Sequence, residues 1–307
     1  MARRTRALAL GAGALALGAA GAHVWARHIE IHRYTLREHT LPILPAGART
    51  VRLLHISDIH LMPDQDRKLA FLRHLAALRP HLVIDTGDNI ASAAAIGPLG
   101  RALDPLLHRP GAFVMGSNDM YAPSPKNPLR YFLPDPRPEG FTDTARDPDL
   151  PTQALREVLG AHGWADLTNA RATIRLPGLD VELTGVDDPH LERDEFPRPV
   201  PAGAGDVPVL RLGVAHAPYR RVLDAFAADG TDLALAGHTH GGQLRLPGIG
   251  ALVTNCDLPR SQARGVSAWD GMALHVSGGL GASPFSNFRT FNPPEATLLT
   301  LRAQDRT

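Results

Sequence analysis

The sequence predicts an α/β fold in which strands and helices form separate layers. Short apolar runs, such as residues 51–57 and 82–85, alternate with segments whose apolar residues recur at helical spacing, such as residues 67–78. The chain has 307 residues, of which 44% are hydrophobic and 21% are charged. This composition is sufficient for the core of one large domain, and the alternation is typical of layered α/β proteins.

In the first half of the chain, the local spacing of apolar residues predicts each helix and strand. Leu69, Leu72 and Leu75 recur at helical spacing ahead of Pro80, which predicts a helix over residues 67–78. The remaining patterns predict strands over residues 51–57, 82–85 and 112–115, helices over residues 98–107 and 152–162, and an irregular, proline-rich excursion over residues 122–151.

In the second half of the chain, the sequence predicts that strands and helices alternate again and that mostly short strands follow. Pro177-Gly178 separates two apolar runs and predicts a hairpin. A second proline-rich loop is expected over residues 193–208. Strands are predicted over residues 172–176, 181–185, 209–215, 233–236, 244–246, 251–255, 274–277 and 296–301, with a helix over residues 219–228. The elements together predict two packed sheets with helices outside them.

The sequence pattern at the N-terminus predicts a segment that is separate from the main domain, which is expected to span residues 51–301. Arg3, Arg4 and Arg6 precede an apolar stretch over residues 7–26 that ends at Arg27. About 20 apolar residues suffice to span a bilayer as a helix, so residues 1–27 are expected to be a membrane anchor. A cleaved signal segment and a soluble arm are the alternatives. The basic cluster predicts that the N-terminus lies inside the cell and that the rest of the chain lies outside the cytoplasm.

Residues 28–50 are predicted to be a linker and residues 302–307 a short tail. An alternating patch near residues 29–36 is compatible with a first edge strand. The formal net charge of +1 provides no bulk attraction for nucleic acid, so no nucleic-acid partner is expected, and the protein is expected to be a monomer. With Cys256 as its one cysteine, the chain has neither a disulfide framework nor a thiolate-rich metal site.

Potential metal ligands stand at the ends of several apolar runs. Asp58 and His60 end one run in SDIH, and Asp88 follows another in TGDN. His216 follows a third run in AHAP, and His238 and His240 end a fourth in GHTH. Carboxylates and imidazoles suit divalent metals, and more ligands are present than one ion needs. Because an α/β sheet gathers strand ends at one edge, these residues predict a two-metal hydrolytic site.

The chemistry expected of such a site is hydrolysis of a phosphoester. Asp88 is the natural bridging ligand, since a carboxylate can bind two ions through its oxygens, and a hydroxide bridging the ions would be the attacking group. Oxygen and imidazole ligands admit Mn, Fe, Zn, Ni or Co. Lys126 and Arg220, and less directly Arg130 and Arg289, are candidate donors to the substrate phosphate.

SDIH, TGDN, GSND, the His of AHAP and GHTH resemble, in this order, the motifs of the calcineurin-like metallophosphoesterases. The resemblance covers residues 50–301. It implies a four-layer fold, with a central β-sandwich of mixed sheets flanked by helices and the metals at one edge. GHTHGGQLRLP and NPPEATLLTL look more narrowly like the bacterial membrane-associated branch, some members of which cleave UDP-2,3-diacylglucosamine or related compounds. The resemblance therefore implies a phosphodiester or diphosphate substrate, such as a lipid or envelope precursor.

Carried over residue by residue, the resemblance assigns one metal to Asp58, His60 and His240. Asp88 would bridge, and His216 and His238 would hold the second metal together with a residue of the third motif, GSND. The family usually has Gly-Asn-His at the start of this motif, so the chain departs from the pattern here. In strict register Ser117 is the ligand and Asn118 contacts substrate. A shift by one residue, which we favour because an amide oxygen is the better neutral donor, makes Asn118 the ligand and leaves Asp119 near the substrate.

Asp88, Asn118 and Asp119 are accordingly the predicted catalytic residues. The altered third motif leaves the leaving-group acid open. It also admits a rival hypothesis, in which the protein binds metal as a scaffold or sensor with degraded catalysis. A phosphodiesterase acting on soluble nucleotides is the other alternative.

Overall fold

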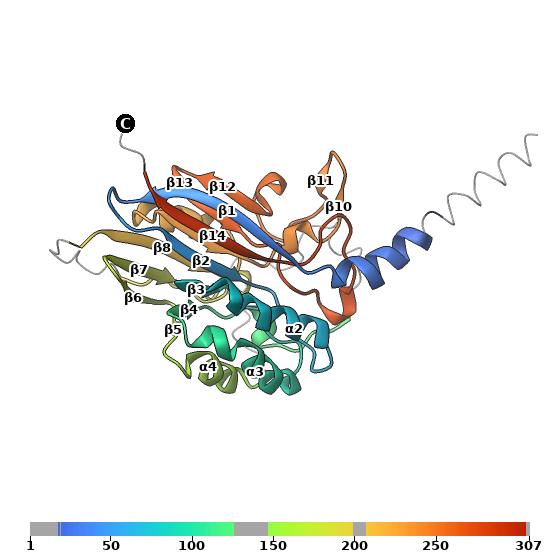
Figure 1. Cartoon of the computed structure of the whole chain (residues 1–307). Helices are drawn as coiled ribbons and strands as arrows, with labels where there is room; N and C mark the ends of the chain where they lie inside the picture. Colours follow the sequence, from blue (N-terminus) through green and yellow to red (C-terminus); the bar gives the residue numbers. More distant parts are fainter. Residues whose placement is uncertain (1–17, 19, 126–146, 199–206, 305–307) are drawn as a thin grey trace, which may run out of the picture.

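Two six-stranded sheets pack face to face in the computed structural model, which describes residues 18, 20–125, 147–198 and 207–304 (Figure 1). The first sheet has the strand order β1-β14-β2-β3-β4-β5. Strand β14 runs antiparallel to β2 and parallel to β1, and β2 to β5 are mutually parallel, so the sheet is mixed. Its strands are β1 (Thr35–Leu44), β2 (Val51–Ile56), β3 (Leu82–Asp85), β4 (Gly111–Phe113), β5 (Ala165–Asp166) and β14 (Glu295–Ala303).

The second sheet has the strand order β12-β13-β9-β8-β7-β6. Its four central strands are mutually parallel, and the hairpin partners β6 and β12 run antiparallel at the two edges. The strands are β6 (Ala170–Leu176), β7 (Leu179–Gly185), β8 (Val209–Ala215), β9 (Leu233–Ala236), β12 (Gly265–Trp269) and β13 (Met272–Val276). A separate small hairpin joins β10 (Arg245–Leu246) to β11 (Gly250–Ala251).

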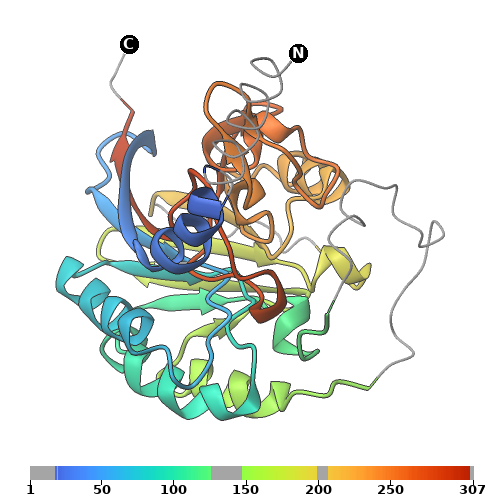
Figure 2. The same ribbon diagram turned by 90° about the vertical axis from the view of Figure 1, so that its right-hand side faces the viewer.

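In the described part of the globular domain, four α-helices lie on the outer faces of the two sheets (Figures 1 and 2). They are α2 (Asp66–Leu75), α3 (Ile96–Leu107), α4 (Thr152–Gly160) and α5 (Arg220–Ala228). Shorter helical turns span Trp25–Ile29, Glu30–His32, Ala76–Leu78, Ala93–Ala95, Ser117–Asp119, Pro189–Leu191, His240–Gly242, Arg260–Gln262 and Pro284–Ser286.

The core follows from the alternation of side chains along each strand. Neighbouring residues of a strand face opposite sides, so Leu53 of β2 packs between the sheets while Leu54 packs under the helices. Helices α2, α3 and α4 share that outer cluster with the first sheet. Phe226 of α5 belongs to a third cluster, which covers the outer face of the second sheet. The result is the helix–sheet–sheet–helix layering that the sequence predicts.

Most predicted elements are present within a few residues of their expected bounds, and two expectations need correction. Residues 28–50 are not only a linker, because they contain the ten-residue strand β1, which pairs with β14. Of that strand only Leu41 and Leu44 are buried, so its exposed side chains conceal it in a hydropathy pattern. The strand predicted over residues 251–255 is reduced to β11, which pairs only with β10.

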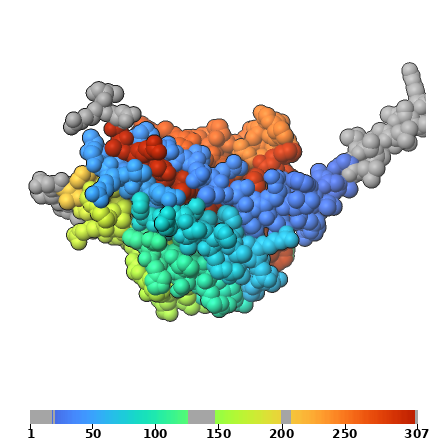
Figure 3. Space-filling model, viewed as in Figure 1, coloured from blue at the N-terminus to red at the C-terminus, as the bar shows by residue number. Residues whose placement is uncertain are grey.

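The apolar N-terminal helix expected over residues 1–27 lies largely outside the described residues. Within the part of the chain that is described, no helix is both long enough and apolar enough to span a bilayer. The described N-terminal segment projects from one end of the globular body, as Figure 3 shows in dark blue. Val24, Trp25 and Ile29 are exposed there by 52%, 45% and 42% of their surface.

The burial of Leu44 predicts that β1 is part of the folded domain. Leu44→Ala should lower the free energy of unfolding by about 2–4 kcal/mol, because the side chain is fully buried between the sheets. Urea unfolding followed by circular dichroism would measure the change. Leu246→Ala, at a side chain 42% exposed, is the control and should be close to neutral. Equal stability of the two variants would contradict a structural role for β1.

Candidate metal centre

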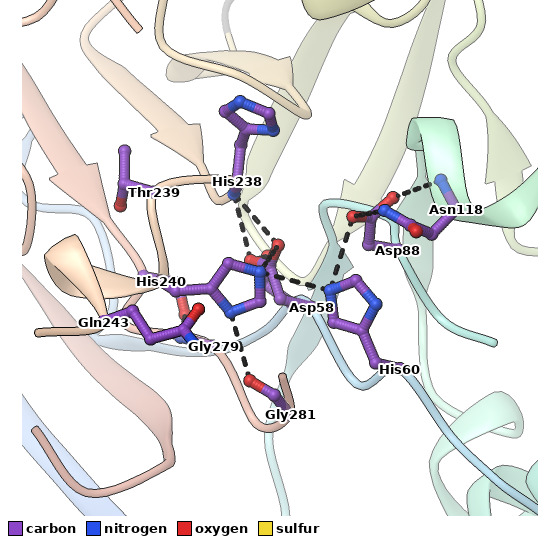
Figure 4. Close-up of polar contacts among 12 residues, drawn as sticks. Asp58, His60, Asp88, Asn118, His238, Thr239, His240, Gln243, Gly279 and Gly281 are labelled. Atoms are coloured by element: carbon purple, nitrogen blue, oxygen red, sulfur yellow. Dashed lines mark hydrogen bonds and ion pairs between the residues drawn. The ribbon is translucent and has the colours of Figure 1, made fainter. Parts of the chain in front are cut away.

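The predicted ligands converge because parallel strands deliver them to the same edge of the two sheets. Asp58 and His60 follow β2, and Asp88 follows the parallel neighbour β3. On the second sheet, His216 follows β8, and His238 follows the parallel neighbour β9. Asn118 lies in the turn after β4, and His240 lies two residues beyond His238. Figure 4 shows the side chains of His60, Asp58, Asp88, Asn118 and His240 pointing toward one another.

The backbone at the ligands adopts a conformation that L-residues rarely take. A positive φ places a residue in the left-handed region, at a cost of roughly 1–2 kcal/mol. Backbone hydrogen bonds between the two loops hold the strain, since Asp58 N donates to Gly87 O at 2.8 Å and His60 N donates to Asp88 O at 2.9 Å. Backbone strain of this kind clusters at functional sites. The residues concerned are Asp58 (φ 49°), His60 (43°), Asp88 (57°), His238 (67°) and His240 (48°).

The first ligand group consists of Asp58, His60 and His240. The Nε2 atoms of His60 and His240 are 3.2 Å apart, and the two rings are stacked. His240 Nε2 is 3.6 Å from Asp58 Oδ1. One donor atom from each of the three side chains therefore faces a common point, as a metal-binding group requires (Figure 4).

The second ligand group consists of His216, His238 and Asn118, arranged around Asp88. His216 Nε2 is 3.5 Å from Asp88 Oδ2 and 3.3 Å from His238 Nδ1. The Asn118 side-chain amide donates to Asp88 Oδ2 at 2.7 Å, and its backbone N–H donates to Asp88 Oδ1 at 2.8 Å. His60 Nε2 is 3.4 Å from the same Oδ2. Asp88 thus contacts both groups through one carboxylate.

The ligand atoms of His216 and Asp88 face each other in a way that calls for positive charge between them. His216 Nδ1 lies 2.7 Å from Thr86 O, so that nitrogen carries a proton and Nε2 faces the Asp88 carboxylate. At this separation a proton or a metal cation must lie between Nε2 and the carboxylate oxygen. Although burial alone would lower the pKa of His216, the carboxylates of Asp88 and Asp188 raise it well above its ordinary value. The surroundings therefore favour positive charge at this point.

The nitrogen separations also agree with shared coordination. Two imidazole nitrogens, each bound at about 2.1 Å to one tetrahedral ion, would stand about 3.4 Å apart. The His60–His240 and His216–His238 separations are 3.2 and 3.3 Å. The structure thus places two histidine pairs at the spacing of ligand pairs, one for each of two ions.

Outer hydrogen bonds fix the orientation of the ligands. His240 Nδ1 lies 3.0 Å from Gly281 O, and His238 Nε2 lies 3.1 Å from Asn255 O. Ser57 Oγ donates to Asp58 Oδ2 at 2.5 Å. Such partners hold an imidazole or carboxylate in the orientation that leaves its other donor atom directed at the metal.

Asp119 lies beneath the centre, where its contacts position the Asp88 loop. Its fully buried carboxylate accepts hydrogen bonds from the backbone N–H groups of Asp88 (2.8 Å), Asn89 (2.6 Å) and Gly116 (3.1 Å). A catalytic residue touches substrate, whereas these oxygens are taken up by backbone donors. The contacts describe a positioning role for Asp119, and its catalytic role stays a prediction. Asn118 donates to the carboxylate of Asp88, and its role as a metal ligand also stays a prediction.

Of the candidate phosphate donors, the structure describes Arg220 and Arg289. Lys126 and Arg130 lie outside the described residues, and Arg220 is exposed at the start of α5. Arg289 is fully buried, with Nη1 donating to Gly278 O at 2.7 Å and Nη2 donating to Gly281 O. Arg289 therefore supports the loop behind His240.

Two features beside the centre escaped the sequence reasoning. Asp187 and Asp188 are buried directly after β7, and burial raises the pKa of Asp188 to about 7. His190 follows, with its ring centroid 4.5 Å from that of His238 and its Nδ1 3.0 Å from the Tyr219 hydroxyl. The sequence does contain a signal for these residues, because Val-Asp-Asp-Pro-His follows an apolar strand, as the predicted ligand motifs do.

The centre is closed on most sides and open on one. Asp58, His60 and His216 are at most 1% exposed. Asn118, His190 and His240 are partly exposed and mark the open side. A buried set of charged ligands with one accessible side suits catalysis on a bound ligand more than a purely structural metal site.

This combination of fold and site defines a metal-dependent phosphoesterase. Residues 51–242 match the family model described as calcineurin-like phosphoesterase. The chain therefore belongs to the calcineurin-like phosphoesterase family, and it is a metallophosphoesterase.

Three relatives extend the likeness along the chain. The metallophosphoesterase YkuE of Bacillus subtilis (strain 168) is 27% identical over 310 residues, covering 96% of this chain and 94% of that protein. The phosphodiesterase YaeI of Escherichia coli (strain K12) is 25% identical, covering 87% and 88%. The protein YpbG of B. subtilis is 27% identical, covering 70% and 71%.

The geometry of the third motif predicts different effects for its two candidate ligands. Asn118→Ala should lower the affinity for the second metal at least about tenfold and so reduce its occupancy, because the Asn118 amide lies at Asp88 Oδ2. Metal content after dialysis against limiting Mn²⁺ would measure this. Ser117→Ala is the matched control and should retain two ions. The reverse outcome would show that Ser117 is the ligand.

Proposed function

We propose that this metallophosphoesterase hydrolyses a phosphodiester or diphosphate bond at a centre of two divalent ions. The observation that carries the proposal is the position of Asp88 Oδ2. This one atom lies 3.4 Å from His60 Nε2, 3.5 Å from His216 Nε2 and 2.7 Å from the Asn118 amide. A carboxylate in contact with two separate ligand groups is the arrangement of a bridging ligand.

The residues divide between the two ions according to these contacts. Asp58, His60 and His240 would hold one ion, and His216, His238 and Asn118 the other, with Asp88 shared. When bound, such ions lower the pKa of water and offset charge on the transferring phosphoryl group. The imidazole and carboxylate donors admit Mn, Fe, Zn, Ni or Co.

The chain's own residues supply orientation and a dry environment. The Asp119 carboxylate holds the backbone of the Asp88 loop, so the shared carboxylate cannot swing away from the two histidine groups. Asn118 donates its side-chain amide to Asp88 Oδ2 and its backbone N–H to Asp88 Oδ1, so it holds both oxygens of the shared carboxylate. Burial of Asp58 and His216 excludes bulk water from the inner side and strengthens the electrostatic interactions there.

A hollow beside the third motif supports a substrate larger than phosphate alone. Its volume is about 410 Å³, and Met120, Leu150, Thr152, Arg156 and Arg193 are among the residues that line it. It adjoins the centre because Thr152 Oγ1 donates to the carbonyl of Asp119 at 2.9 Å. The apolar part of this lining suits an apolar group of the substrate, whereas Arg156 and Arg193 are already paired with Asp166 and Asp187. The name phosphodiesterase carried by YaeI favours the diester among phosphoesters.

The lipid or envelope precursor that the sequence resemblance implies is the finer form of this proposal. It is supported by the apolar stretch over residues 7–26 and by the exposed apolar side chains Val24, Trp25 and Ile29 at and just after its end. Arg33 lies 5.7 Å from the Trp25 ring. Aromatic and basic side chains together favour the interface between membrane and water. We propose that the N-terminal segment anchors the domain outside the cytoplasm.

Hydrolysis of bis-p-nitrophenyl phosphate tests the enzymatic proposal. The purified protein should release p-nitrophenol, lose the activity on treatment with chelator and regain it with Mn²⁺. Asp88→Asn should lower kcat/KM at least about 100-fold, because it removes the shared charged ligand. His74→Ala, at an exposed residue of α2, is the control and should keep wild-type activity. A metal-loaded wild type without turnover on any phosphoester would favour the rival scaffold role, which the altered third motif suggests.

Cell fractionation tests the anchor. The full-length protein should sediment with membranes and be released by detergent, whereas a variant that begins at residue 28 should remain in the supernatant. Immunodetection in the two fractions measures the distribution. Recovery of the full-length protein entirely in the supernatant would overturn the anchor, and a shortened mature N-terminus would instead indicate a cleaved signal segment.

A further inference from the structure

A second group of metal-ligating side chains lies on the surface formed by α3 and α4. Asp104 and His108 are one turn apart at the end of α3, and His162 follows α4. Asp104 Oδ1 is 3.9 Å from His108 Nε2 and 3.9 Å from His162 Nε2. The two imidazole rings have centroids 3.9 Å apart. One ligand atom from each of the three residues lies within 4.8 Å of the others.

This group is separate from the candidate metal centre. His108 precedes β4, which begins at Gly111, and His162 precedes β5, which begins at Ala165. Strands β3, β4 and β5 are parallel, and the centre is built where β3 and β4 end. The surface group therefore lies at the opposite edge of the same sheet, and neither hydrolysis nor substrate binding as proposed above makes use of it.

The segments that carry the two histidines are fixed to each other by buried contacts. Trp164, which is 4% exposed, donates from Nε1 to Arg109 O at 2.9 Å. A Cβ added at Gly111 would come within 2.5 Å of the Trp164 ring, so the two chains approach as closely as glycine permits. The backbones next to His108 and His162 are consequently held in register before any ligand binds. Preorganisation of this kind lowers the entropic cost of binding an ion.

The distances suit a shared ion better than direct bonds between the side chains. At 3.9 Å the two nitrogen–oxygen separations exceed hydrogen-bond length. Two atoms that each bind one tetrahedral ion at about 2.1 Å lie about 3.4 Å apart, so the exposed side chains would need to close by only about 0.5 Å to share an ion. Two imidazoles and one carboxylate favour Zn²⁺, Ni²⁺, Cu²⁺ or Co²⁺ over Mg²⁺ and Ca²⁺.

We propose that Asp104, His108 and His162 bind one transition-metal ion that ties the end of α3 to the end of α4. The side chains of Asp104, His108 and His162 are 60%, 58% and 36% exposed, so an ion can enter directly from solvent. The same exposure makes the site weaker than the buried centre, because the ligands must lose side-chain freedom on binding. Three protein ligands leave coordination positions for water.

Zinc binding to the full-length, detergent-solubilised protein tests the proposal. Equilibrium dialysis against Zn²⁺, with metal and protein both quantified, should give one ion more per chain for the wild type than for His108→Ala or His162→Ala. Zn²⁺ should also raise the Tm of the wild type more than that of either variant, because the ion links two helices. Circular dichroism and phosphodiesterase activity should be unchanged in both variants.

His74→Ala on α2 is the matched control, since it removes another exposed helical histidine and should retain the wild-type number of ions. Asp104→Asn keeps the size of the third ligand and should weaken zinc binding at least tenfold without affecting the fold. Equal zinc content in the wild type and both histidine variants would overturn the proposal. A loss in His74→Ala as large as that in the other variants would do the same, since it would show nonspecific binding to surface histidines.

Discussion

The carboxylate of Asp88 is the constraint on which the site depends. It is buried and stands within 3.5 Å of imidazole nitrogens from both sheets. Burial works against its charge, but His216 and His60 hold its pKa well below the usual range. A carboxylate kept ionised in a dry environment requires positive charge nearby. The two sheets can therefore close on each other at this edge only when cations or protons occupy the space between the ligands.

The loops that hold the ligands around Asp88 adopt locally unfavourable backbone conformations. Five of the proposed ligands have positive φ, and none of these five is glycine. Glycines stand where the loops cross, since a Cβ at Gly237 would come within 1.9 Å of Ser57 Oγ, and one at Gly116 within 2.2 Å of the Asp88 carboxylate. The rigid strands on either side over-determine the loops and hold the strain. Such arrangements sacrifice stability for a fixed ligand geometry.

The sandwich explains how such distant segments can form one rigid site. Strand β14 comes from the C-terminal end of the chain and lies between β1 and β2 from the N-terminal part. The last strand of the chain thereby fixes β2, which carries Asp58 and His60. Glu295 at the start of β14 also accepts hydrogen bonds from Arg264 and from the backbone of Gly278. The C-terminal strand is thus tied both to the first ligand motif and to the loop behind His240.

Much of the fold and nearly all of the inner site were accessible from the sequence. The strands β2, β3, β8 and β9 are short apolar runs, and a polar ligand directly after such a run is a local signal. Asp58, His60, Asp88, His216, His238 and His240 all carry that signal, and the structure brings all six together. The layering also followed, because strand and helix periodicities are local properties of the chain.

Tertiary structure alone decided the remaining features. Strand β1 is largely intermediate or exposed and exists through its pairing with β14, some 260 residues away in sequence, so the alternating patch at residues 29–36 could only suggest an edge strand. The contact of the Asn118 amide with Asp88, and the turning of Asp119 toward backbone donors, depend on where the Asp88 loop lies. The sequence made Arg289 a candidate phosphate donor, whereas its contacts make it a buried support for the loop behind His240. Residue types and hydrophobic periodicity are local properties that the sequence determines. The partner of a long-range hydrogen bond is determined only when distant segments of the chain come together.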